Sequence, residues 1–486
     1  MNHTTRGNLL LAEMQIEDIR KTYEAAGIAA AIVEADGTTV YQKFWGYADT
    51  ETKRELNEDT IFGLASVTKS FTALAVMQLA EEGRIDLDDP VSKYIPEFTN
   101  RNQKKVTIGH LLYHSGGFFP LPRILVGDVA SDLGLTEEKD GDFAYNEAIA
   151  VEGARRVAER LDSLTEESGL NGYPGENFSY CNDGFGLLSE IIRREGKEAS
   201  YAEYLNRHVL EPLQMERSFC DFVRPAQDDN SAVLYKKVDG KMTGSRDYHD
   251  NAFVLNGGGA MKSTLKDLKK YLLMYLNRGE GPSGERLLSR YGIGEMCKGH
   301  QNYLARGSYG YGLSISRMDD ITVIGHGGSL PGVSSNIAWS YEAGAAVIVL
   351  CNTSGVPVGL ISDALMKVYN GHSPIDRRDS WRETSWSAGT IAGACGLYES
   401  GEGTSVKLFE KEPGVIGAEV DGEEKPIIPV NGEAAILRSR YSDGYLRLCR
   451  KENGSIYAVS YGSRMIPKKK EAAGGTEEGE FDGKKL

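Results

Sequence analysis

The sequence predicts an α+β fold, in which helices pack on a five-stranded antiparallel sheet and a small β-barrel follows. Residues 27–49 read as two strands joined by Asp36-Gly37, a dipeptide typical of tight hairpins. Three more antiparallel strands are expected in succession, at 320–328, 333–340 and 345–352, because apolar residues alternate or run together there between turns. Together with the hairpin, these three segments make up the predicted sheet.

Apolar periodicity and terminal glycines predict the helices. The first is expected from Leu9 to Ala26, with Gly27 as its C-cap. The second lies within "IFGLASVTKSFTALAVMQLAEEG", residues 61–83, which is almost wholly apolar from Phe71 to Ala80 and closes at Gly83. Further helices are expected in five segments: 106–117, 147–161, 174–196, one that contains Pro212, and one capped by Ser263.

A change of composition near residue 371 divides the chain, because only short strands and turns follow it. The predicted organisation is a first domain at 1–375, a linker at 376–390, an all-β barrel domain at 391–470 and a disordered tail at 471–486. Within the first domain, residues 118–174 form a long region rich in Asp and Glu. Such a region is either a lid or pocket wall, or a surface decoration.

The charge balance argues against two classes of partner. With 55 basic and 70 acidic residues, the net charge of −15 disfavours nucleic acid and anionic membranes. No run of about 18 apolar residues occurs, so no spanning helix is expected. The N-terminus shows no signal-peptide pattern, and we expect a cytoplasmic protein unless a leader has been removed.

The six cysteines are scattered and form no CxxC pair, and no histidine lies at ligand spacing from any of them. Buried free thiols are therefore expected rather than a metal site or a disulfide framework. We expect no metal and no cofactor.

The chemistry begins at Ser66 and Lys69, at the start of the apolar helix. Residues three apart share a helix face, so the hydroxyl and the amine should be neighbours. Burial disfavours the ammonium form, and a neutral amine can take the serine proton. The positive potential of a helix N-terminus favours an oxyanion beside it. This is the Ser-x-x-Lys way of activating a nucleophile.

The same spacing recurs at Ser263 and Lys266, where a structural explanation is favoured. That helix is amphipathic, and Lys266, Lys269 and Lys270 read as its solvated face, with Ser263 as the N-cap. The helix that carries Lys69 has no polar face, and a buried lysine without a partner is costly. A functional partner is therefore expected for Lys69.

The proposed partner of Lys69 is Tyr180, within the segment "FSYCN". A phenol near a lysine can act as a base or relay a proton. Asn182 would place its amide on the same side if the turn is extended there. Tyr-x-Asn also occurs at Tyr204 and Tyr275, but both lie within helical patterns, where such residues face different ways. The alternative for Tyr180 is a packing role.

A third element is "GHGGS", residues 325–329, at a strand end. Glycines there would let a substrate backbone approach closely. The backbone N–H of Ser329 is the best candidate to join that of Ser66 in an oxyanion hole. His-x-Gly also occurs at His114, where a structural role in bracing a turn is expected.

In this order, Ser66-x-x-Lys69, Tyr180-x-Asn182 and His326-x-Gly328 resemble the serine β-lactamase and penicillin-binding protein superfamily. The likeness extends over about residues 9–370, through "PGENFSYCNDGFGLLSEII" and "NGGGAMKSTLKDL", and is greatest to the class C β-lactamase-like branch. The resemblance implies a β-lactamase/transpeptidase-like fold with an all-helical subdomain. The last β unit resembles the lipocalin-like barrels that some members carry, in which a barrel loop can reach the active site.

The resemblance also implies roles at the matching positions. Ser66 would be the acylated nucleophile, Lys69 and Tyr180 would share general base and acid duty, and Asn182 would orient Lys69 and the substrate amide. His326 stands where β-lactamases and most penicillin-binding proteins carry a lysine. A histidine is charged only part of the time near neutral pH, so it suits a substrate carboxylate less well than a lysine does.

We therefore expect a serine hydrolase that cleaves an amide, peptide or ester bond of a small molecule or short peptide, in the manner of D-aminopeptidases, amidases and esterases. Carboxypeptidase or β-lactamase activity is the alternative. An acyltransferase would use the same residues with another acceptor. A non-catalytic penicillin-binding sensor is disfavoured, because all three motifs are intact and no membrane segment is visible.

Overall fold

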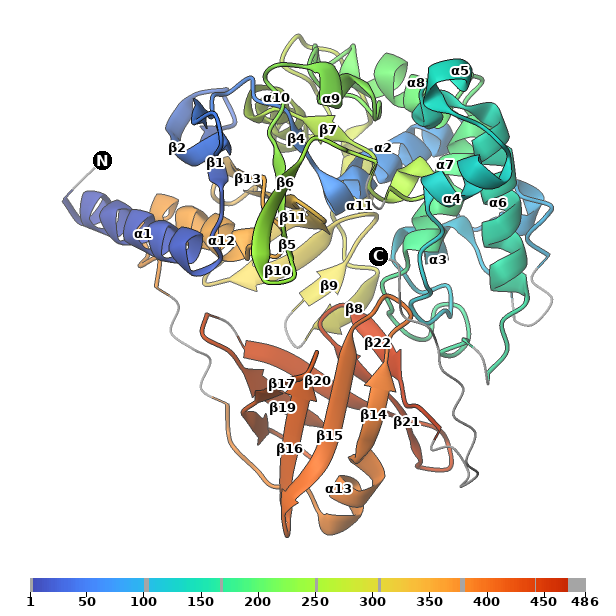
Figure 1. Ribbon diagram of the computed structural model, residues 1–486, viewed down its shortest axis with the longest axis vertical. Helices are drawn as coiled ribbons and strands as arrows, with labels where there is room; N and C mark the ends of the chain where they lie inside the picture. The colour runs from blue at the N-terminus through green and yellow to red at the C-terminus, as the bar shows by residue number, and fades with distance from the viewer. Residues whose placement is uncertain are drawn as a thin grey trace. The chain divides into compact units, whose positions relative to one another are not determined.

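The computed structural model describes residues 3–99, 105–166, 169–249, 252–304, 307–375, 381–441 and 443–470. The chain divides into two compact units, Met1–Ser380 and Trp381–Leu486 (Figure 1). No helix in the described ranges is long and apolar enough to cross a membrane.

The first unit is built on a nine-stranded antiparallel sheet. Its strand order is β3-β2-β1-β13-β12-β11-β10-β9-β8. The five predicted strands are contiguous within it, and they are extended by β3 on one side and by β8, β9 and β10 on the other. The strands are β1 Gly27–Glu34, β2 Thr39–Asp49, β3 Arg54–Glu55, β8 Gln301–Leu304, β9 Gly307–Tyr309, β10 Ser314–Met318, β11 Ile321–Leu330, β12 Val333–Ser340 and β13 Ala345–Cys351.

The central strand β13 is buried on both faces, which explains its unbroken apolar run. One face, with Ala346, Ile348 and Leu350, belongs to the main core, to which α10 (Leu265–Leu276) contributes. Helix α12 (Val358–Tyr369) contacts β12 and β13, and α1 (His3–Thr22) packs on α12 (Figure 1). The predicted combination of a large antiparallel sheet with packed helices is confirmed.

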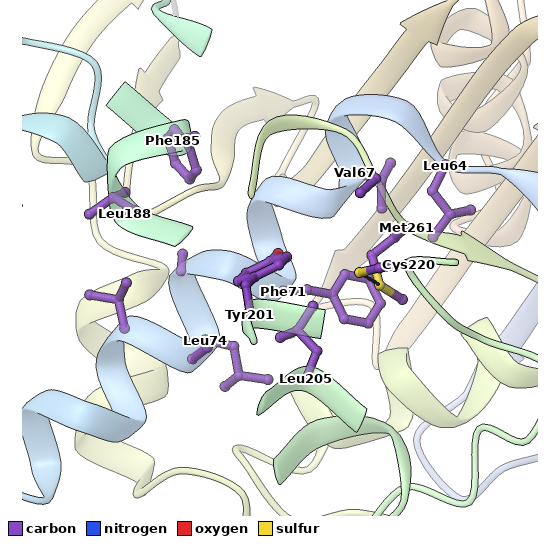
Figure 2. Packing of buried hydrophobic residues seen from close by; sticks show 14 of the residues in the cluster. Leu64, Val67, Phe71, Leu74, Phe185, Leu188, Tyr201, Leu205, Cys220 and Met261 are labelled. Carbon is purple, nitrogen blue, oxygen red and sulfur yellow. Dashed lines mark hydrogen bonds between the residues drawn. The ribbon is translucent and has the colours of Figure 1, made fainter. Parts of the chain in front are cut away.

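Helix α2 (Thr68–Glu81) is buried along almost its whole length, and α7, α8 and α11 contact it. A helix that is apolar all round must be enclosed on every side, and neighbouring helices enclose this one. Figure 2 shows Phe71 and Leu74 of α2 beside Tyr201 and Leu205. The other helices of the first unit are α3 Ile108–Leu112, α4 Val126–Asp132, α5 Glu137–Asp140, α6 Glu147–Asp162, α7 Asn182–Glu195, α8 Tyr201–Leu205, α9 Arg224–Gln227 and α11 Arg290–Met296.

The structure corrects three predicted boundaries. Helix α1 ends at Thr22, and Gly27 is the first residue of β1, where a side chain would meet the Tyr47 carbonyl. The N-cap of α10 is Thr264, whose side chain accepts the Asp267 N–H. Ser263 instead ends the short strand β7 (Lys262–Ser263), which pairs with β4 (Phe62–Gly63).

The third correction concerns the helix expected to contain Pro212. Helix α8 continues only as a π turn, Asn206–Leu210, which ends before the proline. Proline lacks the N–H that a helix interior requires, which accounts for the early end. A short hairpin of β5 (Leu234–Val238) and β6 (Lys241–Ser245) lies further along the chain.

The second unit consists of two antiparallel sheets around one core, in which strands follow one another in chain order. The strands are β14 Gly396–Glu399, β15 Ser405–Glu412, β16 Val415–Val420 and β17 Glu423–Lys425 in one sheet, and β18 Ile427–Pro429, β19 Ala434–Arg438, β20 Asp443–Arg450, β21 Ile456–Tyr461 and β22 Arg464–Pro467 in the other. A bridge between Tyr398 and Lys468 connects the first strand to the end of the last.

Residues of the predicted linker also belong to this second unit. Trp386 is 4% exposed and packs in its core, and α13 (Ala388–Ala394) follows directly. The Trp386 indole donates a hydrogen bond to the Asn431 carbonyl, which holds the segment in place. The predicted tail at 471–486 lies outside the described residues.

Candidate active site

Ser66 lies in a 3₁₀ turn, Ala65–Val67, that leads directly into α2. Of residues 61–77, all of which the structure describes, Ser66 is the only one that is not buried. Ala65 has a φ of +48°, a left-handed conformation that costs a non-glycine residue about 1–2 kcal/mol. This turn brings the Ser66 hydroxyl out of an otherwise enclosed segment.

Lys69 is fully buried, and its Nζ is surrounded by acceptors. The nitrogen lies 3.3 Å from Ser66 Oγ, 2.8 Å from Asn182 Oδ1 and 2.7 Å from the Gly258 carbonyl oxygen. Two fixed acceptors therefore orient the amine toward the serine hydroxyl. Three of the predicted site residues meet here, although they come from the start of α2 and the start of α7.

Tyr180 lies next to this group. It is 5% exposed, and its ring centroid is 4.8 Å from Lys69 Nζ. His114 supports the loop that carries it, because the Cys181 N–H donates to His114 Nδ1 at 3.1 Å and the Ser179 N–H donates to the His114 carbonyl at 2.9 Å. The rings of His114 and Tyr180 are also in contact, with centroids 4.1 Å apart. His114 thus has the bracing role expected from the sequence.

His326 lies on β11 and is 6% exposed. Its Nδ1 is 2.5 Å from the Gly327 carbonyl oxygen and its Nε2 is 2.8 Å from the Tyr309 hydroxyl. A carbonyl oxygen can only accept, so Nδ1 carries a proton. The second hydrogen bond, between Nε2 and the Tyr309 hydroxyl, can run in either direction, so both ring nitrogens are engaged within the protein.

Aromatic rings continue from Tyr309. Phe178 stacks on Tyr303 with ring centroids 4.7 Å apart, and Phe178 and Tyr309 lie 5.5 Å apart. Burial raises the pKa of Tyr303 to about 12, so its phenol stays neutral. These rings form a mostly buried, uncharged cluster next to His326 and Tyr180.

Gly328 brings β11 into contact with the nucleophile turn. A Cβ at Gly328 would lie 2.2 Å from the Leu64 carbonyl oxygen, 2.3 Å from Ser335 Oγ and 3.1 Å from the Ser66 nitrogen. The Ser335 hydroxyl donates to the same Leu64 carbonyl at 2.6 Å. Only glycine permits this approach. Ser329 follows as an exposed residue paired with Ser334, and the oxyanion role of its N–H stays a prediction.

A mostly apolar cavity of about 30 Å³ lies beside the 3₁₀ turn that contains Ser66. Its lining includes Ala65, the residue before Ser66, and Gly259, the residue after the carbonyl that binds Lys69. Leu330 and Val333 line it from the ends of β11 and β12.

Within the described part of the chain, no group of His, Cys, Asp and Glu residues is arranged to hold a metal ion. All six cysteines are free thiols, four of them buried. The candidate site residues supply a hydroxyl, an amine, an amide, a phenol and an imidazole.

A sequence model described as Beta-lactamase matches residues 14–367, most of the chain. The chain belongs to the beta-lactamase family. The resemblance expected from the three motifs is therefore confirmed, and the comparisons support a hydrolase of this superfamily.

Two curated relatives and one solved structure show the range of similar proteins. Protein flp of Staphylococcus aureus (strain MW2) is 31% identical over 196 residues, 39% of this chain and 34% of flp. Esterase EstB of Burkholderia gladioli is 35% identical over 212 residues, 43% of this chain and 50% of EstB. The matches thus span about a third to a half of these relatives.

The solved structure is the octameric penicillin-binding protein homologue from Pyrococcus abyssi. It superposes with a TM-score of 0.63 and 25% identity, and the match covers 95% of this chain and 100% of that chain. The β-lactamase/transpeptidase-like fold predicted from the motifs is therefore confirmed.

Sequence reasoning missed two members of the site. Gly258 contributes a backbone carbonyl to Lys69, and Tyr309 contributes a hydroxyl to His326. The glycine triplet 257–259 was the only visible signal for the first. Tyr309 lies on the short strand β9, and nothing in its sequence context distinguishes it from the other tyrosines.

Proposed function

We propose that the protein is a serine hydrolase that forms an acyl-enzyme on Ser66 and cleaves an amide, peptide or ester bond of a small substrate. The observation that carries the proposal is the buried Lys69 amine, 3.3 Å from Ser66 Oγ and oriented by Asn182 and Gly258. A buried lysine whose partners include a serine hydroxyl is suited to proton transfer rather than to stabilising the fold.

The reaction would proceed in two halves. Ser66 Oγ attacks the substrate carbonyl carbon while its proton passes to the Lys69–Tyr180 pair, and the oxyanion is stabilised by the N–H groups of Ser66 and Ser329. The C–N or C–O bond then breaks, and the proton goes to the leaving amine or alcohol. In the second half a water attacks the acyl-enzyme, gives its proton to the same pair, and releases the acid while Ser66 is restored.

The environment of His326 bears on which class of substrate the site can accept. Both ring nitrogens of His326 are already bonded, to Tyr309 and Gly327, and an imidazole is not a permanent cation that could hold a carboxylate at this position. This favours an aminopeptidase, amidase or esterase over a β-lactamase or carboxypeptidase. The similarity to esterase EstB supports the ester-cleaving form. An acyltransferase remains the second candidate, since it would need only a different acceptor.

The test is active-site labelling followed by a substrate panel. A fluorophosphonate should add its mass to the peptide that contains Ser66, and Ser66→Ala should abolish the label while Ser263→Ala keeps it. Label at an unchanged level in Ser66→Ala would disprove the mechanism. Turnover of p-nitrophenyl esters, amino acid anilides, nitrocefin and D-Ala-D-Ala peptides then identifies the bond cleaved. An added alcohol or amine acceptor shows whether acyl transfer competes.

A further inference from the structure

The Gly258 carbonyl that orients Lys69 belongs to a run of three glycines, residues 257–259. Residues 256–258 form a 3₁₀ turn, and its backbone bonds are long, since the Gly259 and Ala260 N–H groups donate to the Asn256 carbonyl at 3.3 and 3.2 Å. Glycine has the widest choice of backbone conformations, so the residue type does not fix the direction of a carbonyl here. That direction must depend on groups that bind the turn from outside.

Thr72 binds the peptide group next to the Gly258 carbonyl. It lies on α2 three residues after Lys69, so the two side chains share a helix face. Thr72 Oγ1 lies 2.8 Å from the Gly257 carbonyl oxygen, whereas the Thr68 carbonyl oxygen of its own helix lies 3.2 Å away. Two neighbouring side chains of α2 thus bind two successive carbonyls of the glycine turn.

The Tyr201 hydroxyl determines where the Thr72 proton goes. Tyr201 reaches α2 from α8 (Figure 2), and its hydroxyl lies 2.8 Å from Thr72 Oγ1, which is its only hydrogen-bond partner in the described part of the chain. Burial raises the pKa of Tyr201 well above its ordinary value, so the phenol keeps its proton. Because a buried hydroxyl proton without an acceptor is costly, Tyr201 donates to Thr72, and Thr72 donates its single proton to Gly257.

Close packing makes the position of this turn critical. A Cβ on Gly257 would lie 2.4 Å from the Phe185 carbonyl oxygen of α7, and one on Gly258 would lie 3.7 Å from Lys69 Nζ. Helix α7 begins with Asn182, whose Oδ1 is the other fixed acceptor of Lys69. The turn therefore touches both helices that carry the site, and a rotation of one of its peptide groups would move an acceptor of the amine.

We propose that Thr72 is a positioning residue for the reaction, because its hydroxyl, backed by Tyr201, holds the Gly257–Gly258 peptide so that the Gly258 carbonyl points at Lys69 Nζ. Without this bond the amine keeps Asn182 as a fixed acceptor but is no longer directed at the Ser66 hydroxyl, and proton transfer slows. The inference rests on the proposed acyl-enzyme at Ser66 and adds to it residues that touch neither the substrate nor the reacting atoms.

Ser70 supplies a matched control on the same helix. It is also buried, and it also receives a tyrosine proton, since the Tyr271 hydroxyl donates to Ser70 Oγ at 3.0 Å. Its own proton goes to the Val67 carbonyl at 2.8 Å, at the start of α2, and not to the glycine turn. Removing either hydroxyl disturbs one buried carbonyl and one buried tyrosine, so both substitutions should destabilise the fold. Only the loss of Thr72 should affect the chemistry.

The experiment is single-turnover acylation by a fluorophosphonate at several concentrations, which separates the acylation rate constant from the dissociation constant of the reversible complex. In Thr72→Val the rate constant should fall by about tenfold or more while the dissociation constant stays within about twofold, because the groups that bind the probe are unchanged. Thr72→Ser keeps the hydroxyl and should recover most of the rate. Ser70→Ala should acylate within about twofold of wild type.

The outcomes separate this inference from the proposed function. Equal acylation constants in Thr72→Val and Ser70→Ala, or no recovery in Thr72→Ser, overturn it. A crystal structure of Thr72→Val should show the Gly258 carbonyl out of hydrogen-bond reach of Lys69 Nζ, and a retained bond also overturns it. If Thr72→Val does not fold, Tyr201→Phe replaces it in both measurements. Absence of Ser66 labelling in wild type overturns the hydrolase proposal instead, and the crystal structure then decides this one.

Discussion

The chain contains Ser-x-x-Lys twice, and the two copies have opposite environments. Lys69 is fully buried and bonded to Asn182 Oδ1 and the Gly258 carbonyl, while Lys266 is exposed and pairs with Asp59 at 3.3 Å. Ser66 is partly exposed at a turn, whereas Ser263 is buried and bonded to the Ser218 hydroxyl at 2.7 Å. Identical spacing therefore leads to one pair whose environment suits the proposed chemistry and to one structural pair.

The difference follows from the helices rather than from the motif. Helix α2 is apolar on all sides, so the lysine in its first turn is enclosed with the serine. Helix α10 is amphipathic and capped by Thr264, so Ser263 stays in the preceding strand and Lys266 points to solvent. A four-residue motif predicts chemistry only when the whole helix around it is considered.

The largest difference between the two copies is expected when their lysines are substituted. Lys69→Ala should lower the rate of Ser66 acylation by about 10²–10⁴-fold, because the serine loses its proton acceptor. Lys266→Ala should leave the rate within about twofold, since it removes only a surface ion pair. Single-turnover acylation by a fluorophosphonate measures both. Equal rates for the two variants would show that the buried environment of Lys69 has no catalytic role.

A second prediction concerns β11, the strand that approaches the Ser66–Lys69 copy of the motif. Gly328→Ala would place a methyl group 2.2 Å from the Leu64 carbonyl oxygen and should push β11 away from Ser66. We expect acylation to slow by at least about tenfold and the free energy of unfolding to fall by about 1–3 kcal/mol. Acylation rates and denaturant titration measure the two effects.

Gly294→Ala in α11 is the matched control for that substitution. An added Cβ there meets nothing within 4 Å. Alanine is a better helix former than glycine, so this variant should be unchanged in activity and slightly more stable. If both variants acylate at the wild-type rate, the close approach of β11 is not needed for chemistry.

The smallest effect, on the pH dependence of stability, is expected at Lys262, the residue just before the Ser263–Lys266 copy of the motif. Burial lowers its folded-state pKa to about 7, below the ordinary lysine value, so between pH 7 and 10 the unfolded chain holds a proton that the folded chain lacks. The wild-type free energy of unfolding should therefore rise with pH, by about 2 kcal/mol between pH 7 and 9. Lys262→Met should stabilise the protein most at pH 6, and this gain should shrink as the pH rises.

Denaturant titrations at pH 6, 7.5 and 9 measure this dependence. Lys266→Met is the control, because an exposed lysine is not penalised by burial. A gain for Lys262→Met that stays constant with pH would mean that the amine keeps the same charge throughout, and that its burial does not destabilise the ammonium form.

Much of the fold could be predicted because the buried strands carry distinct patterns. β1 and β13 are apolar runs bounded by turns, and Asp36-Gly37 sets the first hairpin. Strands β8, β9 and β10 were not predicted, because they are only three to five residues long and partly exposed, so neither length nor alternation distinguishes them. Their place in the sheet depends on pairing with β11, which is a tertiary effect.

The residues of the candidate site that act through their side chains could be predicted from the sequence. The structure brings Ser66, Lys69, Tyr180 and Asn182 together, and each has a residue type suited to its expected role. Gly258 acts through its carbonyl, which every residue has, so the glycine triplet around it is the only signal in the sequence. Lys262 reads as part of a surface pattern until its burial is known, because sequence alone does not show which lysines are enclosed.

The long-range bonds of Lys69 also bear on how the protein matures. Its Nζ contacts residues 113 and 189 positions away in the chain, and the sheet behind it is completed only when β13 inserts between β1 and β12. Contacts of such large sequence separation form late in folding. A ribosome-bound chain that ends before β13 would lack the completed scaffold. The proposed hydrolytic activity should therefore appear only after synthesis has passed Cys351, and it would report on completed folding of the first unit.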